Sequence, residues 1–450
     1  MQIPMPRKLK ATLPQPMFSE PQFNENGAPT PDPTTFRTAH DQKKDNQLYT
    51  QFQTLLTKDT VSFPISAAKP SDLFMLTDAL GSQGPSDVNS ILNSGKIVFH
   101  AMGDSGASIL PKLADELGVA DHLVNDFHTS TGADRPSFLF HLGDLVYSFG
   151  ESQYYYDQFY EPFRNYPAPI FAIPGNHDSF MVPGTKPADA PLKTFMRNFC
   201  APSPQITQDA GSLHRTAMTQ PGVYFALDAP FVRILGLFSN ALEDPGVISS
   251  QKGKQTKWPG IPNYQLDFLT AQLKKIKSEN YAGAVIIAVH HPPFAYESQK
   301  VGGGSTHSSS TQMLREIDTI CQAQGVYPHA FISGHAHNYQ RFTRKLNFGG
   351  SNYSVPFIVA GNGGHNVTSL VKSKATQDPT PGAQVGYLDP NPAVKTSGLT
   401  MDNFDHSHFG YLRITVDNKL LQIEFHPVGK SLPQLNVDKV VVDLASHSVL

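Results

Sequence analysis

Short apolar runs recur from about residue 96 onward, and each ends abruptly in glycine, aspartate, asparagine or histidine. A run of about four to eight apolar residues bounded by turn-forming residues predicts a buried β-strand. The chain therefore predicts a series of strands that each deliver polar side chains at the carboxyl end. The runs read KIVFHAMGDSG, SFLFHLGDLVYS, PIFAIPGNHDS, AVIIAVHHPPF, HAFISGHAHNYQ and PFIVAGNGGH.

Helical patterns separate these runs. In NYQLDFLTAQLKKIKSEN, the side chains of Leu266, Leu269 and Leu273 share one face, and TQMLREIDTICQAQ has a similar pattern. Buried strands that alternate with amphipathic helices predict a layered α/β domain. In such folds ligands bind outside the carboxyl ends of the strands, which is where the polar ends of these runs converge.

The two ends of the chain differ from this central part. Residues 1–95 are rich in proline and polar residues without sustained periodicity, so we expect an irregular N-terminal extension. After His408, FGYLRITVDNKLLQIEFHPV and KVVVDLASHSVL alternate regularly, which predicts antiparallel strands that close a second sheet. No linker separates these strands from the centre, so residues 96–450 are expected to form one domain.

Composition and charge exclude several classes of protein. The 35 basic and 38 acidic residues give a net charge of -3, which provides no general attraction for nucleic acid. No run approaches the roughly 18 apolar residues that span a bilayer, so no membrane partner is expected. Two cysteines, Cys200 and Cys321, exclude a disulfide framework. The 18 histidines include several close pairs, which favours a transition-metal site.

The polar ends of the strands supply ligands for such a site. They carry two carboxylates, a phenol, an amide and three imidazoles, namely Asp104, Asp144, Tyr147, Asn176, His290, His335 and His337. These hard and borderline ligands suit Fe, Zn or Mn, and the lack of a thiolate argues against a structural zinc site. Seven side chains exceed what one ion with an open position needs, and they suit two ions that share one carboxylate.

The motifs GD-x-G, GD-x-x-Y, GNH-D, H-x-P and GH-x-H follow one another in this order, each at the end of a predicted strand. This ordered set resembles the calcineurin-like metallophosphoesterases, and the tyrosine of GDLVY resembles their purple acid phosphatase branch. The resemblance covers residues 96–425. It implies a four-layer α/β/β/α sandwich of two mostly mixed β-sheets, with a dinuclear metal site at the strand carboxyl ends and residues 96–450 as the catalytic domain.

The resemblance also implies roles for single residues. It assigns three ligands to each metal and one to both: Asp104, Tyr147 and His337 to the first, Asn176, His290 and His335 to the second, and Asp144 as the bridge. The phenolate of Tyr147 is a hard anionic donor that favours Fe(III) in the first site, and Fe, Zn or Mn as a divalent ion suits the second. The H-x-P frame assigns the ligand role to His290, and His291 is expected to contact the ligands without binding the metal.

The function implied by the resemblance is hydrolysis of phosphomonoesters, as in acid phosphatases. A metal-bound hydroxide attacks phosphorus, and a histidine protonates the leaving group. His177, beside Asn176, is the first candidate for this acid, and His307, in the loop after the H-x-P motif, is the second. Asp178 is expected either to orient the ring of His177 or only to close a turn. His365 and His406 are expected to be loop histidines without a metal role.

Two other functions stay open. The same metal centre would support hydrolysis of phosphodiesters, such as cyclic nucleotides or phospholipid head groups, because the ligands do not distinguish the two substrates. A non-catalytic metal-binding protein on this fold is disfavoured, because no ligand position is substituted and His177 is present. The expected partner is a small phosphate ester, and the oligomeric state stays open.

The N-terminal residues bear on the cellular compartment. MQIPMPRKLK is not followed by the apolar stretch of a secretory leader, so a cytoplasmic location is expected by default, and a secreted or periplasmic one if a leader has been removed. Residues 1–95 also show too few alternating strands for the N-terminal β-sandwich of the large plant-like family members.

Overall fold

The computed structural model describes residues 68–147, 149–179, 192–211, 213, 215–239, 246–249, 263–299, 305–371, 380–385, 394–429 and 437–450. Most of the expected N-terminal extension, residues 1–67, lies outside this part of the chain.

Regular structure begins ahead of residue 96. Strand β1 (Phe74–Met75) is followed by helices α2 (Leu76–Ala79) and α3 (Gly84–Ser94). Pro85 stands in the first turn of α3, and Gly95 ends this helix in the left-handed conformation at φ 76°, as glycine commonly does. Because β1 pairs with a strand of the larger sheet, this segment is part of the domain.

Within the described residues, the larger of two mixed sheets has nine strands and contains both parallel and antiparallel pairs. Their order across the sheet is β1, β5 (Phe225–Ala229), β6 (Val232–Leu237), β7 (Ala284–Val289), β10 (Ala330–Ser333), β12 (Ser351–Ala360), β11 (Tyr339–Phe348), β14 (Lys395–Asp405) and β13 (Ala383–Gln384). Strands β6, β7, β10 and β12 run parallel, so their carboxyl ends meet at one edge.

The second sheet has seven strands in the part of the chain that the structure describes. Their order is β18 (Ser448–Val449), β17 (Asp438–Asp443), β16 (Leu420–Val428), β15 (Phe409–Asp417), β2 (Lys96–Met102), β3 (Leu139–His141) and β4 (Ile170–Ala172). Strands β2, β3 and β4 are parallel. The C-terminal strands pair antiparallel and join the sheet beside β2, which confirms the arrangement predicted from their alternation.

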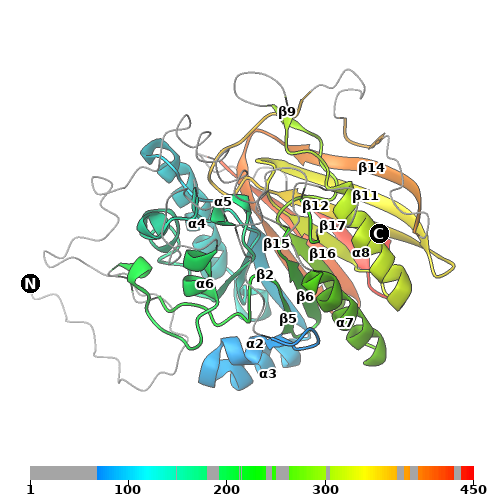
Figure 1. Ribbon diagram of the computed structural model, residues 1–450, viewed down its shortest axis with the longest axis horizontal. Helices are drawn as coiled ribbons and strands as arrows, with labels where there is room; N and C mark the ends of the chain where they lie inside the picture. Colours follow the sequence, from blue (N-terminus) through cyan, green and yellow to red (C-terminus); the bar gives the residue numbers. More distant parts are fainter. Residues whose placement is uncertain are drawn as a thin grey trace, which may run out of the picture.

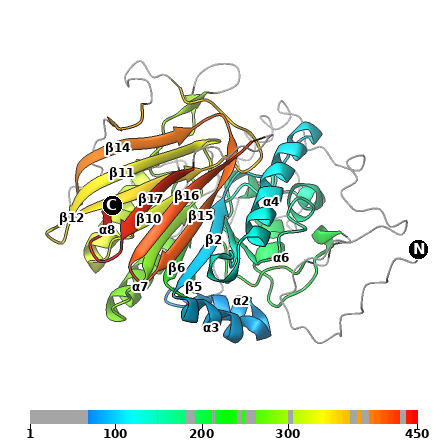
Figure 2. The same cartoon turned by 180° about the vertical axis from the view of Figure 1, so that it is seen from behind.

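The two sheets pack face to face and helices cover their outer faces. Across the interface the ring of Phe140 stacks on that of Phe225 with centroids 6.0 Å apart, and the rings of Tyr339 and Phe425 lie 4.0 Å apart. Helices α7 (Tyr264–Ser278) and α8 (Thr311–Gln324) lie against the nine-stranded sheet (Figure 1). Helix α4 (Leu110–Thr129) lies on the opposite side, against β15 (Figure 2). The expected four-layer α/β/β/α sandwich is therefore correct.

Shorter elements complete the described part. They are α5 (Asn176–Ser179), α6 (Lys193–Phe199), the hairpin of β8 (Ser298–Gln299) and β9 (Ser305–Thr306), and the short helices Gly81–Gln83, Gly132–Asp134, Ser152–Tyr154, Tyr156–Tyr160 and Gln208–Ala210. None of the helices in the described residues has the length and apolar character that a bilayer crossing requires.

The helices follow the predicted periodicity. In α7, Leu269 and Leu273 are fully buried, whereas Lys274 on the other face is exposed. Burying a leucine side chain stabilises the fold by about 2 kcal/mol, so this apolar stripe holds the helix on the sheet.

A buried polar network ties α4 to the seven-stranded sheet. The ring of His100, on β2, lies 2.7 Å from a carboxylate oxygen of Asp126 on α4. The same oxygen accepts a hydrogen bond of 3.0 Å from Arg413 on β15. Burial alone would raise the pKa of Asp126, but the hydrogen bond to His100 and the charges of His100 and Arg413 lower it to about 2.

Asp126→Asn is therefore expected to lower the free energy of unfolding by about 2 kcal/mol at neutral pH. The folded-state pKa lies below the unfolded value of about 4, so this contribution is present above about pH 4 and is lost as the pH falls toward 2. Urea unfolding of both proteins across this range measures it. Asp121→Asn, at an exposed position on the same helix, is the matched control. A deficit in the Asp126 variant that stays constant down to about pH 3 would contradict the assignment.

Candidate metal centre

Parallel strands from both sheets deliver the predicted ligands to one place. The motif loops follow β2, β3 and β4 of the smaller sheet and β7 and β10 of the larger one. In these loops Asp104, Asp144 and His335 have φ values of 60°, 57° and 67°. Residues other than glycine rarely adopt this left-handed conformation, and where they do the cause is often functional.

Two glycines allow these loops to approach each other closely. A Cβ atom on Gly143, where φ is 102°, would lie 2.5 Å from the backbone nitrogen of Gly175 and 2.7 Å from a ring nitrogen of His290. A Cβ atom on Gly175 would collide with the carboxylate of Asp144. The GD and GN dipeptides of the motifs are therefore required by packing around the ligands.

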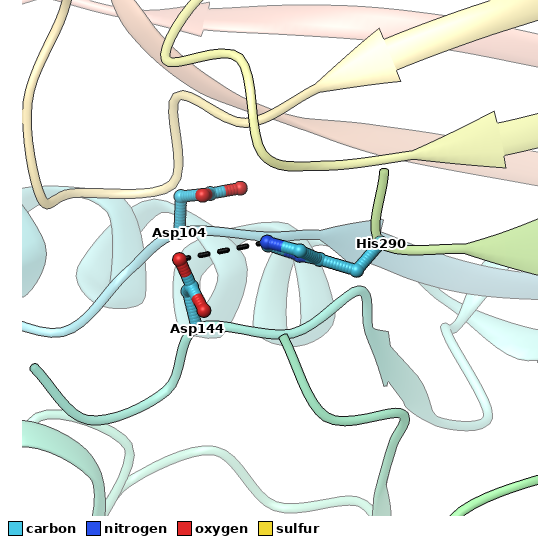
Figure 3. Close-up of side chains that lie close together, drawn as sticks. All are labelled: Asp104, Asp144 and His290. Carbon is cyan, nitrogen blue, oxygen red and sulfur yellow. Dashed lines mark ion pairs between the residues drawn. The ribbon is translucent and has the colours of Figure 1, made fainter. Parts of the chain in front are cut away.

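Three of the predicted ligands form a compact buried group. Asp104, Asp144 and His290 each offer an atom, and these atoms all lie within 4.8 Å of one another. Figure 3 shows the three side chains converging, with the Nε2 atom of His290 3.5 Å from a carboxylate oxygen of Asp144. All three are at most 1% exposed.

The other predicted ligands of the first metal lie beside Asp104. The hydroxyl of Tyr147 is 3.3 Å from an oxygen of Asp104 and 3.3 Å from Nε2 of His337. The same nitrogen of His337 is 3.5 Å from Asp104. A phenol, a carboxylate and an imidazole thus point at one space.

The second predicted group meets around Asn176. Its amide oxygen is 2.9 Å from Nε2 of His290 and 3.2 Å from Nδ1 of His335. Nδ1 of His290 donates to the carbonyl of Leu142 at 2.8 Å, which turns Nε2 toward the other ligands. The Nδ1 atom of the His291 ring lies 2.8 Å from the hydroxyl of Ser239. The structure brings all seven predicted ligands together.

Comparison with known proteins identifies the family. The family model of the calcineurin-like phosphoesterases matches residues 99–339. This chain belongs to that family. The matched residues include every predicted ligand of this phosphoesterase, from Asp104 to His337.

Two solved structures show more distant likeness. The first, GAP50, described as the anchor in the inner membrane complex of Plasmodium, aligns with a TM-score of 0.44 and 11% identity, over 76% of this chain and 88% of its own. The second, PhoD, aligns with a TM-score of 0.42 and 12% identity, over 78% of this chain and 71% of its own. No curated protein sequence matches the chain.

The charges in the phosphoesterase centre fit a site for cations. Burial, together with the charge of Asp144, raises the pKa of Asp104 to about 8 against the opposing effect of His290. Burial would also raise the pKa of Asp144, but the positive charges of His290 and His177 hold it well below its usual range. Two buried carboxylates and an amide oxygen form a set of acceptors in one place, which cations satisfy.

Asp178, for which the sequence left open orienting the ring of His177 or closing a turn, binds a row of backbone N–H groups. Its carboxylate accepts hydrogen bonds from the backbone N–H groups of Asp144 at 2.7 Å and Gly175 at 2.9 Å. It also accepts from Leu145 and Val146 at 3.0 and 3.1 Å. This one side chain therefore holds the GDLVY and GNHD loops of the phosphoesterase together.

Both histidines predicted as proton donors lie at the centre. The backbone N–H of His177 donates to Asp144 at 2.9 Å, and its ring lies 4.3 Å from that of Tyr147. The ring of His307 lies 4.7 and 5.1 Å from those of His335 and His337. Its Nδ1 atom is buried and has no hydrogen-bond partner among the described residues.

The two expected loop histidines differ in position. His406 accepts a hydrogen bond from the backbone N–H of Leu370. His365 lies in the centre, because its ring stacks on that of Tyr147 with centroids 3.5 Å apart. Both ring nitrogens of His365 have hydrogen-bond partners, the ammonium of Lys112 and the carbonyl of Gly106.

Two residues that hold Tyr147 or its stacked neighbour His365 in place could not be found from sequence patterns. The side chain of Gln158 accepts from the backbone N–H of Tyr147 at 2.8 Å and donates to its carbonyl at 2.6 Å. Lys112 donates to His365 at 2.8 Å. Neither residue belongs to a motif, and no spacing along the chain indicates these contacts.

Asp178→Asn is expected to lower the free energy of unfolding by about 3 kcal/mol, because an amide NH₂ group would face backbone donors that the carboxylate now satisfies. The metal content of the purified protein should fall as well, because the loop of Asp144 loses its anchor. Urea unfolding and metal analysis measure the two effects. Unchanged stability and full metal content would show that Asp178 does not hold these loops.

Proposed function

We propose that this phosphoesterase is a dimetal-dependent hydrolase of small phosphomonoesters, of the purple acid phosphatase type. The observation that carries the proposal is the hydroxyl of Tyr147, 3.3 Å from both Asp104 and His337. The proposal assigns this hydroxyl, as a phenolate, to a trivalent iron. Family membership supports the coarser statement, a phosphoester hydrolase that uses metals.

The ligands divide into two groups that suit different ions. Asp104, Tyr147 and His337 would hold Fe(III), because a carboxylate and a phenolate are hard anionic donors. Asn176, His290 and His335 would hold a divalent ion, Fe, Zn or Mn, and Asp144 would serve both sites. When bound, the two cations polarise the phosphoryl oxygens and activate water for attack.

The residues around these ligands support the remaining parts of the reaction. His177 lies against Tyr147 and is partly exposed, so its ring can reach a substrate and donate a proton to the leaving alkoxide. His307 is half-buried against two ligand histidines, and its buried Nδ1 atom offers a second ring nitrogen. Neutral imidazoles around a phosphoryl group also donate hydrogen bonds to its oxygens.

The proposed function predicts two metals per chain, including iron, and a broad visible charge-transfer band that Tyr147→Phe abolishes. It also predicts a higher kcat/KM for an aryl phosphate than for the corresponding bis-aryl phosphate. Metal analysis, the visible spectrum and parallel assays measure these quantities. Two metals without colour would refute the iron–tyrosinate assignment, and preference for the bis-ester would make the enzyme a phosphodiesterase.

His177→Ala is expected to lower kcat at least about 100-fold for an alkyl phosphate, whose alkoxide must be protonated as it leaves. The loss should be much smaller for 4-nitrophenyl phosphate, since nitrophenolate leaves without a proton. His307→Ala, assayed in parallel, shows which histidine is the acid, and His128→Ala, at an exposed position on α4, is the control. Equal losses on both substrates would contradict the role of His177 as the acid.

A further inference from the structure

Lys112, in the first turn of α4, donates from Nζ to Nε2 of His365 at 2.8 Å. The other ring nitrogen of His365, Nδ1, lies 2.6 Å from the carbonyl oxygen of Gly106 and must donate to it, because a carbonyl only accepts. His365 is thus a neutral imidazole with both nitrogens engaged. It fixes the position of the Lys112 ammonium without neutralising its charge.

No carboxylate among the described residues lies within ion-pair distance of this ammonium. Asp115, one turn along α4, acts on Lys112 only from a greater distance. Glu116 directs its carboxylate to the backbone N–H of Ala107 instead. Lys112 is half-buried, and burial lowers its pKa to about 8 despite the charge of Asp115. A desolvated cation without a counter-ion is costly, and an anion bound beside it would remove that cost.

This cation lies next to the metal centre. The ring of His365 stacks on Tyr147 and lies 5.2 Å from the ring of His337. After burial itself, the charge of Lys112 is the largest influence that lowers the pKa of His337. The ammonium therefore stands one side-chain layer outside the ligands of the first metal. A substrate group beyond the transferred phosphoryl group is therefore the part that this ammonium would contact.

We propose that Lys112 is a specificity-determining residue that binds a second anionic group of the substrate. This deepens the proposed function and rests on it. The substrate class is that of phosphate esters and anhydrides with a further negative charge close to the reacting phosphorus, diphosphates being the smallest. Water adds to the reacting phosphorus, the bridging P–O bond breaks, and the released phosphate takes the bond electrons and a proton.

The test compares two substrates and two ligands on the metal-loaded protein. The first measurement is the ratio of kcat/KM for pyrophosphate to that for phenyl phosphate. The second is the Kd of imidodiphosphate, which has a P–N–P bridge in place of P–O–P, against that of inorganic phosphate, both by calorimetry. Lys112→Met removes the charge, Lys112→Arg keeps it, and Lys274→Met removes an exposed lysine of α7 as the control.

We expect Lys112→Met to lower the kcat/KM ratio and to weaken imidodiphosphate binding relative to phosphate, each about tenfold, because a charge-assisted hydrogen bond is lost. Lys112→Arg should keep most of the wild-type kcat/KM ratio and of the relative affinity for imidodiphosphate. Lys274→Met should change neither quantity. A parallel loss with both substrates and both ligands would overturn the proposal, since it would mean that Lys112 only positions His365 against Tyr147. No change in either ratio would overturn it as well.

The assay separates this proposal from the proposed function. If the wild-type protein hydrolyses neither substrate but Lys112→Met still weakens imidodiphosphate binding, the anion site stands and the phosphatase function falls. If the wild-type protein hydrolyses phenyl phosphate and the Lys112 variants keep both ratios, the function stands and the role of Lys112 falls.

Discussion

Two buried carboxylates that face the same space are the constraint on which the metal centre depends. Asp104 and Asp144 are almost fully buried, and their like charges oppose each other. Backbone donors offset part of the free energy lost by burying these charges. Asp104 accepts a hydrogen bond from the backbone N–H of His335, and Asp144 accepts one from the backbone N–H of His177, which follows the ligand Asn176. The same hydrogen bonds thus fix the geometry of the loops that carry the remaining ligands, and cations provide the rest of the compensation.

The centre exists only where the two sheets meet. The carboxylates, the phenol and the amide follow strands of the seven-stranded sheet, whereas the three ligand histidines follow β7 and β10 of the nine-stranded sheet. Stacked rings such as those of Tyr339 and Phe425 hold the two sheets in contact. A core substitution that shifts one sheet against the other would therefore separate hard anionic ligands from imidazoles, even far from the metals.

Much of the fold and the ligand set could be predicted from the sequence, because each ligand directly follows a buried strand whose apolar run is visible in the chain. The position of His290 and His335 after buried strands was visible in this way, whereas their expected ligand role came from the ordered set of motifs and the family that it resembles. The hydrogen bonds of Asp178 to four backbone N–H groups could not be predicted. Three of these groups lie about thirty residues away in the sequence, and the local sequence around Asp178 indicates only a turn. No sequence motif indicated the roles of Gln158 and Lys112, because their contacts arise from packing between segments that are separate in the sequence. Helix α3 was absent from the prediction for residues 1–95, although Pro85 in its first turn and Gly95 at its end are typical of helix boundaries.

The position of β15 has a consequence for biosynthesis. Strand β2, which carries Asp104 at its end, pairs with β3 on one side and with β15 on the other. Residues 409–417 leave the ribosome some three hundred residues after β2, so during translation β2 remains the open edge of a three-stranded sheet. An open edge is prone to pairing with other chains. Pairing with other chains is therefore a risk for β2 until β15 has been synthesised. The seven-stranded sheet that carries more than half of the predicted metal ligands is completed only near the end of translation.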